Sequence, residues 1–143
     1  MDDLVQFLRD RLAEDAKTAL SAALGRSKYA AWRAEETDVY TQEVILSGHA
    51  HRVADTGPTY PGADDYEEDA ARAAHIARHD PARVLREVEA KRRILDSYLP
   101  DAVSADEQIN EEWHTGSALA DDLLCLLALP YSDHPDYRDD WRP

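Results

Sequence analysis

The sequence has 143 residues, which suits one ordinary domain and is too short for two. Its formal net charge is -14, from 16 basic and 30 acidic residues, so electrostatic binding to nucleic acid or to an anionic membrane is disfavoured. No stretch reaches the ~18 apolar residues of a membrane span, and no secretory leader is recognisable. The single cysteine, Cys125, excludes an intramolecular disulfide, so we expect a reducing, cytoplasmic location.

The first predicted element is a helix over residues 2–24. Apolar residues recur from Leu4 to Ala23 at spacings of three and four, which places them on one helical face. Asp2 or Asp3 can cap the first turn, and Gly25 is placed to end the helix.

Residues 29–55 have a different pattern, which predicts two or three short antiparallel strands. Valine, isoleucine, tyrosine and threonine are frequent there, and these residues suit strands better than helices. Ser47 and Gly48 fit a turn between two of the strands. A loop rich in proline and glycine follows and leads to the next helix.

Two further helices are predicted, over residues 64–79 and 81–99. The first has an alanine-rich face that would allow another helix to approach closely. The second begins with Asp80 as a capping side chain and Pro81 at the first helical position, and Pro100 is expected to end it at Leu99. Residues 70–99 hold seven bases and four acids, which makes this region net basic in an acidic chain.

A last helix is predicted over residues 105–129. Ser104 and Glu107 have the spacing of a capping box, and Gly116 is a candidate interruption. The segment from Leu119 to Leu129 is apolar nearly all round, so we expect a deeply buried helix that Pro130 stops. Cys125 is interpreted as a small core residue there.

Together these elements predict an α+β fold. We expect a mostly helical single domain with a small antiparallel hairpin or three-stranded sheet, followed by an aromatic tail over residues 130–143.

Three segments of the chain are distinctive: HDPARVLREVEAKRRIL, LALPYSDHPDYRDDW and the opening DDLVQFLRDRLAED. On these segments the chain closely resembles a family of small actinobacterial (Streptomyces-type) proteins classed as a domain of unknown function. The resemblance covers nearly the whole chain and implies no activity. It also implies that some relatives carry cysteine pairs before the segment equivalent to CLLALPY, where they would bind metal. This chain has only Cys125 there, so that site is not carried over.

Paired histidines give the sharpest chemical hypothesis, a divalent metal site. His49 and His51 would point to the same face of a strand, and His75 and His79 lie four apart on one helical face. Against this hypothesis, the chain has no H-E-x-x-H motif, and His79 is equally explained as a residue at a helix junction. The sequence has neither a G-x-S-x-G motif nor a glycine-rich phosphate loop, so we assign no catalytic residues.

The tail offers a second hypothesis, because Tyr131, Tyr137 and Trp141 are residue types that often anchor a partner protein. An intramolecular clasp onto the body of the protein explains the same residues.

We therefore expect a non-enzymatic protein-interaction module whose partner is another protein. A metal-binding protein or metal-dependent enzyme is the alternative. A third hypothesis is an acidic inhibitor that imitates the phosphates of DNA and occupies a nucleic-acid-binding protein, without binding nucleic acid itself. The sequence leaves the oligomeric state open.

Overall fold

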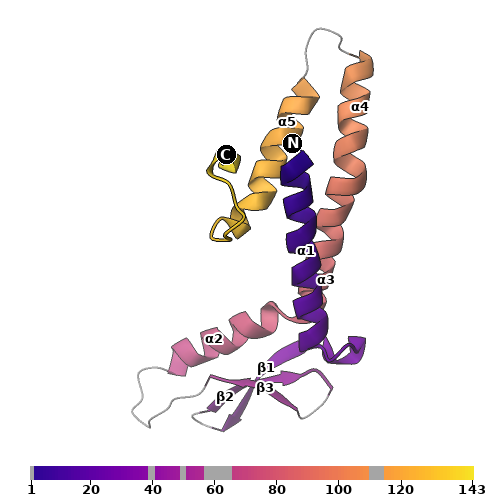
Figure 1. Ribbon diagram of the computed structural model, residues 1–143. Helices are drawn as coiled ribbons and strands as arrows, with labels where there is room; N and C mark the ends of the chain where they lie inside the picture. Colours follow the sequence, from indigo (N-terminus) through magenta and orange to yellow (C-terminus); the bar gives the residue numbers. More distant parts are fainter. Residues whose placement is uncertain (1, 39–40, 49–50, 57–65, 110–114) are drawn as a thin grey trace. The chain divides into compact units, whose positions relative to one another are not determined.

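The computed structural model describes residues 2–38, 41–48, 51–56, 66–109 and 115–143 (Figure 1). The contacts divide the chain into two compact units. Unit 1 is Met1–Asp15 with Glu87–Pro143, and unit 2 is Ala16–Arg86. The predicted α+β class, mostly helical with a small antiparallel sheet, is confirmed. That the chain forms a single domain stays a prediction.

Helix α1, Asp2–Ala22, has the predicted apolar stripe, and its buried side chains include Leu8 and Leu12, each 1% exposed. The helix ends two residues before the predicted position. Gly25 has a φ of +64°, and its N–H donates to the carbonyl of Leu20 at 2.8 Å. The N–H of the preceding residue, Leu24, donates to the carbonyl of Ser21 at 3.0 Å. This pair of bonds is the Schellman pattern of a helix end, and Leu24, with a φ of +52°, takes the left-handed position that glycine usually occupies.

Unit 2 contains the sheet, whose strands are β1 (Trp32–Asp38), β2 (Thr41–Leu46) and β3 (Arg52–Asp55). They pair antiparallel in the order β1-β2-β3. Helix α2, Tyr66–Arg78, contacts β1 and β2 (Figure 1). Its alanine face therefore packs near strands, with Ala73 fully buried, whereas the sequence pattern had predicted a close approach to another helix.

Asp80 joins the sheet to the start of α3, Pro81–Arg93, and confirms the predicted cap. Its Oδ1 accepts the backbone N–H of Arg83 at 2.7 Å, which is the capping bond of a helical first turn. Its Oδ2 accepts the backbone N–H of Trp32 at 3.2 Å. One carboxylate therefore satisfies an orphan donor of the helix and a donor at the start of β1.

The prediction that Pro100 ends the helix is wrong. The chain continues through one turn of π-helix, Ile94–Tyr98, into α4, Leu99–Ile109. In that turn the N–H of Leu99 donates to the carbonyl of Ile94, five residues back. A proline ring in an α-helix clashes with the carbonyl four residues earlier, and the wider π turn relieves that crowding, so the proline is tolerated.

The prediction of one helix over residues 105–129 is also wrong. Ser104 lies inside α4 and therefore does not cap a new helix. Helix α5, Thr115–Ala128, is separate, and residues 110–114 lie outside the described residues.

Unit 1 is held together by the N-terminal part of α1, by α4 and α5, which contact each other, and by the C-terminal segment (Figure 1). Its buried side chains are mainly leucines from α1, the π turn and α5, with one tryptophan from the tail: Leu4, Phe7, Leu8, Leu12, Val88, Leu95, Ala120, Leu124, Ala128 and Trp141. Among the described helices, none combines the length and the apolar composition needed to cross a membrane.

Candidate functional site

Helix α5 is apolar around much of its circumference, and only part of that apolar surface is buried. Ala120, Leu124 and Ala128 recur every four residues and are buried in unit 1. Leu119, Leu123 and Leu126 lie on a neighbouring face of the helix, with 65%, 36% and 53% of their surface exposed. We call these three residues the leucine face.

The expectation that α5 is deeply buried is therefore wrong for the leucine face. Periodicity shows that a helix is apolar all round, but it does not show how many neighbours surround that helix. In unit 1, Ala120, Leu124 and Ala128 pack into the core, and no described element covers the leucine face.

An acidic side chain borders the leucine face. Asp122 is exposed on the same helix, three residues after Leu119 and four before Leu126, so it lies next to the leucine face. Residues 115–143 hold six aspartates and two arginines. The electrostatic potential near this part of the chain is therefore negative, and it favours an approaching cationic group.

The tail, which follows α5, packs its aromatic rings on Phe7 of α1. The ring centroid of Phe7 lies 6.3 Å from that of Tyr131, 6.1 Å from that of Tyr137 and 5.0 Å from that of Trp141. These distances lie in the range of favourable aromatic pairs, and Trp141 is only 8% exposed. We call this cluster the aromatic clasp.

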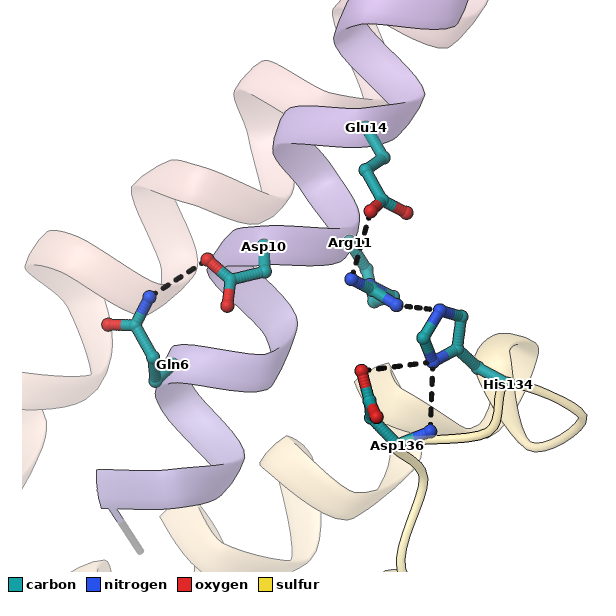
Figure 2. A network of polar contacts seen from close by, with 6 residues as sticks. All are labelled: Gln6, Asp10, Arg11, Glu14, His134 and Asp136. Carbon is teal, nitrogen blue, oxygen red and sulfur yellow. Dashed lines mark hydrogen bonds and ion pairs between the residues drawn. The ribbon is translucent and has the colours of Figure 1, made fainter.

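A polar network lies beside the clasp (Figure 2). Arg11 is buried, its guanidinium contacts Nε2 of His134, and its Nη2 donates to Oε1 of Glu14 at 3.0 Å. On the other side of the imidazole, the backbone N–H of Asp136 donates to Nδ1 of His134 at 3.1 Å. His134 is thus positioned by Arg11 of α1 and by the backbone N–H of Asp136 in its own loop.

Two more contacts fasten the tail to α1. The hydroxyl of Tyr131 donates to Oδ2 of Asp15 at 2.6 Å. Burial, and then the hydrogen bond to this carboxylate, raise the pKa of Tyr131 above its ordinary value, because both disfavour the phenolate. Arg138 pairs with Asp140 at 2.6 Å and with Asp3 at 3.2 Å, and these acids raise the pKa of its guanidinium.

Sequence reasoning identified three of the four clasp residues and missed Phe7, and it also missed Arg11 and His134 of the polar network. The four-residue spacing of Phe7 and Arg11 on α1 was the available signal, since it puts both on one face. The geometry accounts for Tyr131, Tyr137 and Trp141 as intramolecular packing. Whether they also contact a partner stays a prediction.

The four histidines of the metal hypothesis belong to unit 2. His49 lies outside the described residues, and His51 is exposed just before β3. His75 and His79 lie on and just after α2, with ring centroids 4.3 Å apart, and Nδ1 of His79 is 2.9 Å from the carbonyl oxygen of His75. Among the residues with described positions, no group of three or more histidine, cysteine or acidic side chains could hold a metal ion. The four-histidine site stays a prediction.

A comparison with protein families finds that a model of a family of unknown function, DUF6221, matches residues 1–143. The chain belongs to DUF6221. This membership confirms the resemblance to a domain of unknown function, and it covers α5, the clasp and the histidines alike. No curated protein and no solved structure matches the chain.

Proposed function

We propose that this DUF6221 protein is a non-enzymatic protein-interaction module and that the leucine face of α5 is its docking surface. The observation that carries the proposal is the exposed row of Leu119, Leu123 and Leu126 on a face of α5 that the described residues leave open. Contiguous exposed apolar side chains are typical of interaction sites. Burying a fully exposed leucine is worth roughly 1.5–3 kcal/mol, and these leucines, which are 36–65% exposed, would each contribute part of that to the free energy of binding.

The partner that suits this surface is a different protein with an apolar helix edged by lysine or arginine. The apolar stripe of such a helix would cover the three leucines, and its basic edge would meet Asp122 and the acidic tail. A second copy of the same chain suits the surface less well, because it would bring Asp122 and the other aspartates of this region toward like charges.

Affinity capture from the native host, with three forms of the full chain, tests the proposal. The wild type is compared with Leu119→Gln/Leu126→Gln and with a control, Leu20→Gln/Leu24→Gln, which changes two exposed leucines of unit 2. We expect one or more proteins to be retained by the wild type and the control and lost by the leucine-face variant. If all three forms retain the same proteins, or none, the proposal is wrong.

Sedimentation of the purified chain distinguishes the two kinds of occupant. A dimer that the leucine-face variant abolishes would assign the surface to a second copy and would overturn the choice of a different protein. We expect the wild type and the Leu119→Gln/Leu126→Gln variant to have the same sedimentation coefficient, because neither forms a dimer through this surface.

The other hypotheses have less support. Contact of Tyr131, Tyr137 and Trp141 with a partner remains a secondary proposal, since their rings already pack in the clasp. The metal-binding hypothesis rests on the contact of His75 with His79, and the DNA-mimic hypothesis on the net charge alone. The cytoplasmic location remains part of the proposal because the chain has a single cysteine.

A further inference from the structure

Unit 1 contains a groove that the docking surface does not use. It has a volume of about 640 Å³, which is within the usual range of small-molecule sites. Its walls come from α1, from the π turn with α4, and from the buried side of α5. Ala120 and Leu124 of α5 line the groove, whereas Leu119, Leu123 and Leu126 do not. A ligand in the groove and a protein on the leucine face would therefore occupy different surfaces.

Most of the groove wall is apolar, with Val5, Leu95, Leu99 and Val103 among the lining residues. Some of the polar lining residues already have partners, and others have none among the described residues. Arg9 is already paired, with its Nη2 2.7 Å from Oδ1 of Asp96. The amide nitrogen of Gln6 donates to Asp10 at 2.9 Å.

The carboxylates on the groove wall are left without partners. Asp121 has a buried Oδ1 that accepts no hydrogen bond, although a buried carboxylate oxygen strongly favours a donor. Asp2 also lines the groove, and within the described part of the chain it makes no hydrogen bond or ion pair. The groove thus combines apolar walls with unneutralised negative charge.

We propose that this groove binds a small organic cation, an amine or amidine with an apolar body. The carboxylate of Asp121 would turn its buried Oδ1 toward the groove to accept the cationic N–H groups, and the apolar body would lie against Leu99 and Val103. An anionic ligand does not fit, because the one arginine on the wall is already neutralised by Asp96. A bare metal ion does not fit either, since the described residues offer no cluster of three ligating side chains.

Titration of the full chain with n-hexylamine, followed by NMR chemical shifts, tests the proposal. n-Hexanol serves as the neutral probe of the same shape. We expect saturable binding of n-hexylamine with a Kd of about 1 mM or lower, with shifts at Val103 and Leu124, and at least tenfold weaker binding of n-hexanol. Failure of n-hexylamine to saturate would overturn the proposal.

Two variants and a control locate the site. Asp121→Asn keeps the shape of the side chain and removes its charge, so we expect at least tenfold weaker binding of n-hexylamine. Asp122→Asn is the matched control, because it removes the same charge from the exposed neighbour. Ser104→Trp fills the groove from an exposed position and should abolish binding even if Asp121→Asn fails to fold. Equal affinities of the Asp121→Asn and Asp122→Asn forms for n-hexylamine would mean that only the overall negative charge attracts the amine, and they would contradict the proposed site in the groove.

Discussion

The two tyrosine hydroxyls of the aromatic clasp differ in hydrogen bonding. The hydroxyl of Tyr131 donates to Asp15 at 2.6 Å, whereas the hydroxyl of Tyr137 is buried and has no partner among the described residues. Both rings pack against Phe7, at centroid distances of 6.3 and 6.1 Å. Replacing either tyrosine by phenylalanine keeps the ring and removes only the hydroxyl, so the pair separates the hydrogen bond from the packing.

We predict that Tyr131→Phe lowers the free energy of unfolding by about 1 kcal/mol at neutral pH, as measured by urea denaturation. Folding raises the pKa of Tyr131 above its ordinary value of 10.0, so its contribution is fully present below pH 10.0 and is lost as the pH rises through the higher folded-state value. The difference between wild type and Tyr131→Phe should therefore shrink at pH values above 10.0. Tyr137→Phe is the control and should cause no loss of stability. Equal losses in the two variants would contradict the assignment of the hydrogen bond to Tyr131.

Sequence reasoning at the residue scale succeeded where the partner is local and failed where it is distant. Asp80 was recognised because a capping side chain bonds an N–H three residues on. The contact of Arg11 with His134 spans 123 positions in the sequence, and no local pattern indicates such a pair. The second bond of Asp80, to Trp32, could not be predicted for the same reason.

We predict that Asp80→Ala destabilises unit 2 by about 1–3 kcal/mol, because it removes the cap of α3 and leaves the N–H of Trp32 without its acceptor. Asp80→Asn keeps one side-chain oxygen and should retain the cap while losing the second bond. Its loss should therefore be smaller. Urea denaturation of the three forms measures the differences. An alanine variant as stable as the wild type would show that the junction does not depend on this carboxylate.

At the scale of elements, the type of each segment was easier to predict than its end or its burial. The helices and the antiparallel strands follow from apolar periodicity and β-branched residues. The π turn at Ile94–Tyr98 could not be predicted, because proline ordinarily marks a boundary and a change of hydrogen-bond pattern leaves no sequence signal of its own. The uncovered side of α5 was missed because burial depends on the number of neighbouring elements.

The aromatic clasp gives a prediction at this scale. Tyr137→Ala/Trp141→Ala should lower the free energy of unfolding by at least about 3 kcal/mol, since Trp141 is 8% exposed and both rings pack on Phe7. Tyr98→Ala is the matched control, because that ring is 69% exposed, and its effect should stay within about 0.5 kcal/mol. Urea denaturation compares the forms. A double variant that keeps wild-type stability would mean that the tail is not fastened to unit 1.

At the scale of the whole molecule, the predicted elements taken together correctly indicated a mostly helical α+β chain, and the net charge of -14 shaped the hypotheses about partners. The same charge bears on the proposed partner, because Asp122 beside the leucine face and the net negative C-terminal segment favour a basic edge on the protein that covers it. The paired histidines remain a prediction from spacing, with His49 outside the described residues.

The most direct test of the docking proposal is the affinity of the captured partner, purified, for three forms of the full chain. Leu119→Gln/Leu126→Gln should raise the Kd at least tenfold relative to the wild type, since each leucine contributes part of the roughly 1.5–3 kcal/mol that burying a fully exposed leucine is worth. The Leu20→Gln/Leu24→Gln control should bind within about twofold of the wild type, a difference well below 1 kcal/mol. Equal Kd values for the leucine-face variant and the wild type would contradict the account.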